Sequence, residues 1–374
     1  MLKVDRNLID EIMTAAHLLS TQNDTQNAIL QLRKTLHMAM RLEASTIPPY
    51  LVAAWSIQDS PNFQNEEIRD LITDIAKEEM LHMMGIANII AATGEPPKIA
   101  TPEIVLDWGV SRLPVGGDLV PRLAPFSESL LTDLLMEIEK PEDPIHYVVV
   151  EAFQPQKAGL VEGRYATIGE FYKALLDLIN TFQYDPFEEG QSHPQIKMSF
   201  DRRIGEIDHD PITDFQVTDK DQAKAIINWI IGQGEGTPSD PMTGNGIPAH
   251  YYRFAEIYKR GKLTRDVFAP LGYVYDRAQH PIECDFSKIQ QFRPNPKMRD
   301  FDPSSSHYRG LKIFNEAYTR VFHKIQVFYS DNNQQQEIPY SINSMNNMVN
   351  YVEPLFSLDP PICPSFEWIE DVSH

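Results

Sequence analysis

The sequence predicts an all-α protein, in which a bundle of long helices is interrupted by an irregular insertion and followed by extra helices. Two observations support this prediction. Apolar residues recur at helical spacing over residues 25–58 and 65–92, and prolines and glycines concentrate in residues 95–165. We therefore expect a helical bundle over residues 1–265, with 95–165 as its loop-rich insertion. A helical extension that packs on the bundle is expected over residues 266–374.

The charge and cysteine content exclude several classes of protein. The 374 residues carry 53 acidic and 33 basic side chains, a formal net charge of −20. An acidic surface repels phosphate groups, so we expect neither nucleic acid nor an anionic membrane as a partner. Two cysteines, Cys284 and Cys363, are too few for a disulfide framework or a cysteine-rich metal site. Because the sequence has neither a signal-peptide pattern nor a membrane-length apolar run, we expect a cytoplasmic protein.

The first predicted helix covers residues 25–58. Its apolar stripe includes Leu36 and Ile47. Pro48 and Pro49 fall inside this helix, and each proline removes an amide donor and clashes with the preceding turn. We therefore expect the helix to kink or break at this point.

The second predicted helix covers residues 65–92, with Asn65 suited to cap its first turn. Within the insertion only residues 127–139 have a helical pattern, and the β-branched run 146–153 predicts a strand. Irregular chain is expected beyond about residue 265. Further helices are predicted over residues 167–183 and 218–233, and a short one begins near Pro248. The last two predicted helices cover residues 305–330 and 340–357.

The second helix contains a Glu-x-x-His motif. Glu79 and His82 are three residues apart and therefore lie on one helical face, which continues through the apolar Ile75 and Ile86. A carboxylate turned toward a core costs several kcal/mol unless something compensates it, and a divalent metal ion does so. Bundles that bind two iron or manganese ions use this motif. The alternative is a surface carboxylate near a core histidine with satisfied hydrogen bonds.

A second carboxylate interrupts the apolar stripe of the first helix. Glu43 stands seven residues after Leu36 and four before Ile47, where an apolar residue is expected. Two antiparallel helices with a short connection would bring it level with the Glu-x-x-His motif. Tyr50 lies on the same stripe and is a candidate catalytic residue, since it could hydrogen-bond a metal ligand or exchange electrons with the metal. An ordinary core tyrosine is the alternative.

The segments LEASTIPPYLVAAWSI and IAKEEMLHMMGIANIIAATGEPP resemble the ferritin-like family of the iminophenyl-pyruvate dimer synthases. This is the C-terminal domain of enzymes that couple two oxidised tryptophan-derived imines in violacein- and rebeccamycin-type pathways. The resemblance covers most of residues 25–357 and implies a ferritin-like bundle. Further similar segments are LAPFSESLLTDLLMEIEKPE, TIGEFYKALLDLI, IIGQGEGTP, AHYYRFAEIYKRGKL and FNEAYTRVFHKI.

The resemblance implies one or two iron ions, or manganese in their place, and adds Glu170, Glu235 and His250 to the candidate ligands. Glu170 could instead close a capping box with Thr167. Glu235 lies at a helix C-terminus, where the helix dipole disfavours an acid, so its place in the row with Ile231 indicates an inward role. His250 begins an apolar stripe and could instead be a core histidine.

One feature departs from a symmetric two-metal site. A second Glu-x-x-His motif is expected, yet Ile247 stands three residues before His250. The other such spacing, Glu206-x-x-His209, lies in a loop rich in proline and aspartate, where no helix would present it to a core. We therefore expect either one metal ion or two that are held unevenly.

These features predict a metal-dependent, non-haem iron oxidoreductase. Its substrate would be a small organic molecule, such as an amino-acid-derived imine or 2-oxo acid in secondary metabolism. The insertion 95–165 and the loop 234–248 are the expected covers of its pocket. Two alternatives stay open: an iron-handling protein for ferroxidation or storage, and a metal-binding scaffold without catalysis. A homo-oligomer and a separate partner oxidase are both compatible with the sequence.

Overall fold

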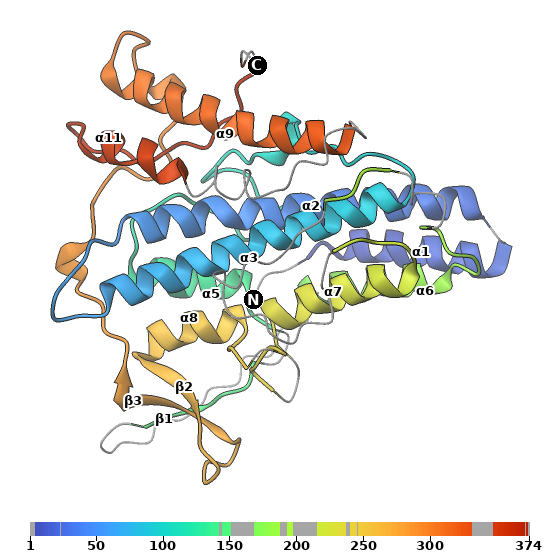
Figure 1. The fold of residues 1–374 in the computed structure, drawn as a ribbon, viewed down its shortest axis with the longest axis horizontal. Helices are drawn as coiled ribbons and strands as arrows, with labels where there is room; N and C mark the ends of the chain where they lie inside the picture. Colours follow the sequence, from blue (N-terminus) through green and yellow to red (C-terminus); the bar gives the residue numbers. More distant parts are fainter. Residues whose placement is uncertain are drawn as a thin grey trace.

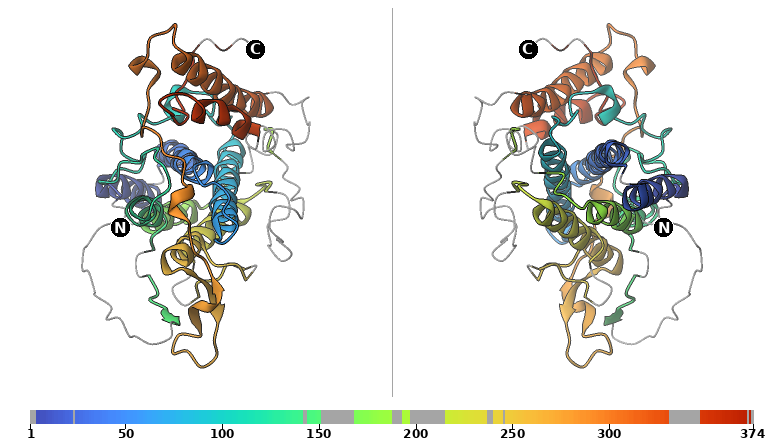
Figure 2. Two further views of the ribbon diagram at one scale, coloured as in Figure 1. Left: turned by 90° about the vertical axis from the view of Figure 1, so that its left-hand side faces the viewer. Right: turned by 90° about the vertical axis from the view of Figure 1, so that its right-hand side faces the viewer.

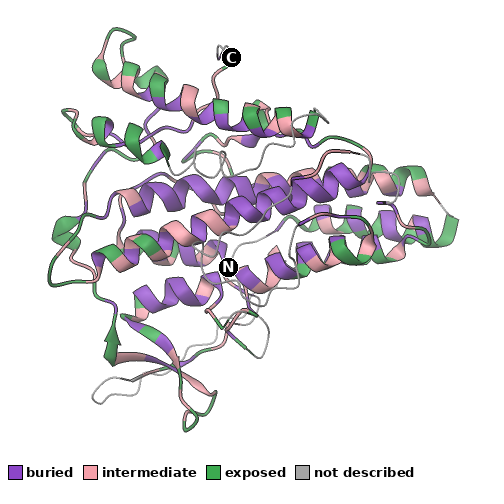
Figure 3. Cartoon of the chain, in the orientation of Figure 1, coloured by how far each residue is buried: buried purple, intermediate pink, exposed green. Residues whose placement is uncertain are grey.

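Two long helices, α2 (Thr25–Trp55) and α3 (Asn65–Ala92), form the centre of the computed structural model (Figure 1). They are antiparallel and pack against each other along their length. Every residue from Leu42 to Ala54 and from Glu79 to Ala92 is buried, so both helices are enclosed on all sides at this level (Figure 3). The structure describes residues 4–22, 24–141, 144–150, 168–187, 193–196, 215–236, 240–244, 246–330, 347–370 and 372.

The prediction of a kink or a break at Pro48 and Pro49 is wrong as to the break, because α2 continues through both residues to Trp55, whereas the kink stays a prediction. Each proline costs the helix an amide donor, which amounts to about 3 kcal/mol in an exposed helix. Both prolines are buried here and have buried neighbours on either side. Tertiary packing around this part of α2 therefore offsets the local cost.

Two predicted helix starts shift slightly. The N-cap of α3 is Gln64, whereas Asn65 is the first helical residue and its side chain donates to the carbonyl of Gln58 at 2.8 Å. Helix α7 begins at Lys220, where Asp219 is the N-cap and accepts a hydrogen bond from the amide of Gln222 at 2.9 Å. Both shifts are within the usual uncertainty of helix ends.

Further helices cover one side of the central pair. Helix α1 was not predicted; it packs on α6 and α2, and α7 packs on α6 and α3. Helix α8 contacts α3 and α7, which places its first residue against the buried part of α3. The bounds are α1 (Arg6–Gln22), α6 (Ile168–Thr181), α7 (Lys220–Gly234) and α8 (His250–Lys259).

In the part of the insertion that the structure describes, residues 95–141 and 144–150, the predicted helical segment 127–139 is present. It includes a π-helical turn, η2, and ends beside α8. Its parts are α4 (Glu128–Leu130), η2 (Leu131–Leu135) and α5 (Met136–Ile138), and a short 3₁₀ turn, η1 (Pro102–Ile104), precedes them.

A small sheet of strand order β1-β3-β2 projects from the bundle beside α8 (Figure 1). Strand β1 (Val148–Val150) lies within the predicted strand and runs parallel to β3 (Tyr273–Pro281). Strand β2 (Gly261–Arg265) is antiparallel to β3. The expectation of irregular chain beyond residue 265 is therefore wrong for β3. The β2–β3 pair also spans the expected division between bundle and extension.

The C-terminal segment packs on the side of the central pair opposite the sheet (Figure 2). Its main helix is α9 (Ser306–Ser330), and η6 (Asn347–Tyr351) and α11 (Glu353–Phe356) pack against it. Two 3₁₀ turns, η4 (Phe286–Lys288) and η5 (Met298–Asp300), lie in the connection before α9. Trp55 of α2 stacks on Phe366, with ring centroids 6.2 Å apart. Among the described residues, no helix has the length and apolar character that crossing a membrane requires.

Candidate metal centre

Five buried side chains converge inside the bundle in two overlapping clusters. Glu43, Glu79 and His82 form one, which we call the His82 half, and Glu79, Glu139 and His250 form the other, the His250 half. Within each half, one potential ligand atom per residue lies within 4.8 Å of the others. All five side chains are at most 7% exposed. Because Glu79 belongs to both halves, the two clusters form one continuous centre.

Four chain segments supply these side chains. Glu43 lies in the middle of α2, and Glu79 and His82 lie one turn apart on the facing side of α3. Glu139 directly follows α5, and His250 is the first residue of α8. The structure thus brings together four of the six predicted metal ligands and adds Glu139, which the sequence analysis did not identify.

Each histidine turns its Nδ1 atom toward two carboxylates. Nδ1 of His82 lies 3.4 Å from Oε2 of Glu43 and 3.6 Å from Oε2 of Glu79. Nδ1 of His250 lies 2.8 Å from Oε1 of Glu79 and 3.5 Å from Oε2 of Glu139. The two rings are nearly parallel, with centroids 5.5 Å apart.

The buried Nδ1 atom of His250 makes no well-formed hydrogen bond, although Oε1 of Glu79 lies 2.8 Å away. A buried polar atom normally has a partner. An imidazole nitrogen that faces two carboxylates and lacks a hydrogen bond fits a metal ligand. This atom is the most specific indication that the residues of the centre suit a cation.

The opposite nitrogen of each histidine has a hydrogen-bond partner outside the cluster. Nε2 of His82 lies 2.8 Å from Oε1 of Gln233, and Nε2 of His250 lies 2.7 Å from Oε2 of Glu78. A neutral imidazole that donates from Nε2 to such an oxygen would have the lone pair of Nδ1 available for a metal ion. Such outer partners orient metal-binding histidines in many proteins.

Tyrosines hold the two carboxylates that are not shared. The hydroxyl of Tyr172 on α6 donates to Oε1 of Glu43, and the hydroxyl of Tyr50 on α2 donates to Oε1 of Glu139. Each of these carboxylates therefore turns its other oxygen, Oε2, toward a histidine. The structure thus places Tyr50 on a candidate metal ligand, whereas electron exchange through it stays a prediction.

The centre holds several carboxylates with little access to water. Burial and the neighbouring charge of Glu79 raise the pKa of Glu43 to about 8. Burial alone would lower the pKa of His82, but Glu79 and Glu43 outweigh it and raise that pKa to about 10. Protons therefore neutralise the centre in the absence of another cation. A divalent metal ion would displace these protons and compensate the carboxylates.

Three carboxylates and two imidazoles form a donor set that suits iron or manganese. The symmetric two-metal bundle would use four glutamates and two histidines. Ile247 stands three residues before His250, where the sequence motif would have its second glutamate, and it precedes α8. Among the described residues, the two clusters therefore supply five of the six donors. Glu206 and His209 lie outside the described residues.

Glu170 and Glu235 belong to neither half of the centre. Oε1 of Glu235 accepts a hydrogen bond from the amide of Gly169 at 2.9 Å, near the N-terminus of α6. A Cβ atom on Gly169 would lie 2.5 Å from Oε2 of Glu235, so a larger residue would require the Glu235 side chain to shift. Glu170 is half-buried in the first turn of α6, and its expected capping partner, Thr167, lies outside the described residues. Their role as ligands stays a prediction.

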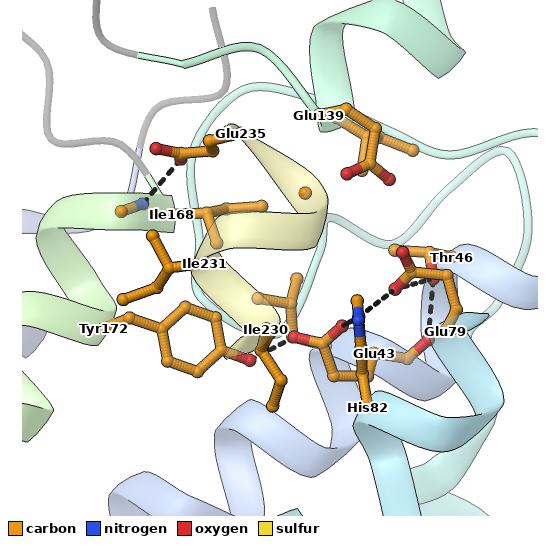
Figure 4. Close-up of a pocket in the computed structure, with 14 residues that line it drawn as sticks. Glu43, Thr46, Glu79, His82, Glu139, Ile168, Tyr172, Ile230, Ile231 and Glu235 are labelled. Atoms are coloured by element: carbon orange, nitrogen blue, oxygen red, sulfur yellow. Dashed lines mark hydrogen bonds and ion pairs between the residues drawn. The ribbon is translucent and has the colours of Figure 1, made fainter. Parts of the chain in front are cut away.

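A narrow cavity lies beside the centre (Figure 4). Glu235 lines it together with the carboxylates of the centre, so that Glu235 faces the cavity as well as α6. The cavity has a volume of about 30 Å³, which gives room for about two water molecules. The apolar part of its wall consists of Leu42, Ile138, Ile168, Ile230 and Ile231.

Comparison with known proteins agrees with the fold. A sequence model of the ferritin-like family matches residues 36–259, more than half of the chain. A 2-imino-3-(indol-3-yl)propanoate dimerase from Chromobacterium violaceum is 27% identical over 267 residues, which cover 64% of this chain and 24% of that enzyme. The chain thus matches only about a quarter of that enzyme's length.

The fold also resembles a solved structure. The crystal structure of a ferritin-like protein from Caulobacter vibrioides superposes with a TM-score of 0.51 and 18% identity. The similarity covers 89% of this chain and 96% of that chain, a larger share of this chain than the family model matches. The chain belongs to the ferritin-like family.

Proposed function

We propose that this protein is a metal-dependent, non-haem iron oxidoreductase that couples small organic molecules, with an amino-acid-derived imine or 2-oxo acid as substrate. The buried centre of three glutamates and two histidines beside a cavity is the observation that carries this proposal. The similarity to an enzyme named as an imine dimerase supports the substrate class. Coupling reactions of this kind are typical of secondary metabolism.

The residues of the centre would hold the metal and orient it. The tyrosines fix the outer carboxylates, the Nε2 partners fix the histidine rings, and Glu79 would link two metal positions. Iron bound there would supply one-electron chemistry with dioxygen or peroxide. The apolar cavity wall, which includes Ile230 and Ile231, would exclude bulk water from a reactive substrate.

The size of the cavity sets a condition on this reaction. Space for about two waters suits a small oxidant but not an aromatic imine. We infer that side chains at the cavity wall, such as Ile168 and Ile231, move when an organic substrate enters. An imine hydrolyses readily in water, so a partner oxidase that forms it nearby fits the proposal.

The proposal is tested by adding imines to protein reconstituted anaerobically with ferrous iron. The imines are generated in situ from aromatic amino acids with an amino-acid oxidase. Joining two imines with loss of two hydrogens removes two electrons, so we expect imine-dependent consumption of dioxygen or peroxide and a product of matching mass. His82→Ala should lower this rate by more than the roughly 10–100-fold effect of losing an outer partner of a ligand. The exposed His17→Ala serves as a control.

Two other results would contradict the proposal. Rapid oxidation of excess free ferrous iron, with mineral formation and no response to any organic compound, would establish iron handling instead. Reconstituted protein that neither retains metal nor responds to imines would favour the scaffold.

A further inference from the structure

The two halves of the metal centre are built alike up to the histidine ring. Each half has a carboxylate that is not shared with the other half. Its Oε1 atom accepts a hydrogen bond from a tyrosine hydroxyl, and its Oε2 atom faces the Nδ1 atom of a histidine. Each half also faces one oxygen of Glu79. The matched sets are Tyr172, Glu43 and His82 in one half, and Tyr50, Glu139 and His250 in the other.

The halves differ in the group behind the histidine. Nε2 of His82 lies 2.8 Å from the side-chain amide oxygen of the buried Gln233. This amide carries no charge. Nε2 of His250 faces a carboxylate oxygen of Glu78 at 2.7 Å, and Arg253 donates to the same oxygen. A carboxylate partner makes an imidazole a more basic ligand than a neutral amide does.

The shared Glu79 adds a second difference in the same direction. Its Oε2 atom, on the side of His82, accepts a hydrogen bond from Oγ1 of Thr46 at 3.2 Å. Its Oε1 atom lies 2.8 Å from Nδ1 of His250. Thr46 has one hydroxyl hydrogen, and its shorter contact is with the carbonyl oxygen of Glu43 at 2.7 Å, so this second difference is small beside the first.

We propose that the two halves bind divalent metal unequally, with the His250 half the tighter one and Gln233 the residue that makes the His82 half weak. This inference rests on the metal centre of the proposed function. Changes to the outer partner of a metal-binding histidine alter affinity by roughly 10–100-fold. We therefore expect the two dissociation constants to differ by about tenfold or more. Glu78 and Gln233 are positioning residues that act through the histidines.

The test is an anaerobic titration of metal-free protein with Co²⁺, followed by its visible absorption and by competition with a coloured chelator. The wild type should fill in two separate steps. Gln233→Glu should lower the dissociation constant of the weaker step and bring the two dissociation constants closer together. Glu78→Gln should raise the dissociation constant of the tighter step. His82→Ala should abolish the weaker step and His250→Ala the tighter one. Controls with the same charge changes at exposed positions are Gln291→Glu and Glu66→Gln.

The outcomes separate this inference from the metal centre itself. Two equal steps, or a gap that Gln233→Glu leaves unchanged, would overturn the inequality while the centre stands. If only one ion binds, its loss in His250→Ala supports the inference and its loss in His82→Ala overturns it. No binding at all would overturn the metal centre. Glu78→Asp, which keeps the charge, should retain more affinity than Glu78→Gln; equal losses would indicate a packing role.

Discussion

Replacing Glu79 with glutamine is expected to remove the metal that the centre binds. Glu79 is the residue common to both halves, and its two oxygens face different histidines. A glutamine side chain fills nearly the same space but carries no charge, so neither half would keep two anionic ligands. Metal analysis after reconstitution and desalting should give less than about a tenth of the wild-type content, as expected when each half loses a ligand rather than an outer partner.

The matched control is Glu66→Gln, which removes the same charge from an exposed position on the same helix. This control should retain wild-type metal content, and both variants should keep their helical circular dichroism. Full metal occupancy in Glu79→Gln would mean that the metal binds elsewhere in the protein.

Removing the metal with a chelator is expected to lower thermal stability strongly. A ligand that binds only the native state adds about 4 kcal/mol at a thousandfold excess over its dissociation constant. In a protein of this size each kcal/mol corresponds to about 2 °C in the melting temperature, so we expect a fall of roughly 5–10 °C. Scanning calorimetry measures the melting temperature before chelation, after chelation and after iron is restored.

Glu79→Gln provides the control for chelation, because a variant without metal should melt at the same temperature with and without chelator. An equal fall in this variant would show that the chelator acts on the protein itself. An unchanged wild-type melting temperature, after proven metal removal, would contradict strong native-state binding.

The central helices could be predicted from the sequence because their patterns are local. The stripes of α2 and α3, and the patterns of α7 and α9, gave helices close to those in the structure. The sheet could not be predicted in the same way, because Val148 of β1 pairs with Val274 of β3, far along the chain. The β-branched run predicted β1 as a strand, but its partner strand could not be identified from a local pattern.

The His82 half was predictable because Glu43 and the Glu-x-x-His motif interrupt apolar stripes. His250 was identified as a candidate ligand from the family resemblance. Glu139 was missed because the helical segment before it was assigned to the insertion, and the π-helical turn Leu131–Leu135 changes which residues face inward. The sequence did contain one indication of Glu139. It is an acid at the C-terminus of a predicted helix, where the helix dipole disfavours it, and the same reasoning was applied to Glu235.

The outer partners could not be identified from sequence alone. Glu78 and His250 are 172 positions apart, and Gln233 and His82 are 151 apart. Glu78 looks like an ordinary polar neighbour of Glu79 until α8 is placed against α3. Tyr172 stands two residues after Glu170, so the resemblance pointed to the right helix turn but not to the residue that contacts Glu43.

The most direct test of a two-metal centre in this bundle is an anomalous difference map, collected at the iron absorption edge from crystals reconstituted with ferrous iron. Two peaks are predicted, one on each side of Glu79, one next to Nδ1 of His82 and the other next to Nδ1 of His250. A map with no peak beside Glu79, or with its peaks bound by other residues, would contradict the assignment of this centre.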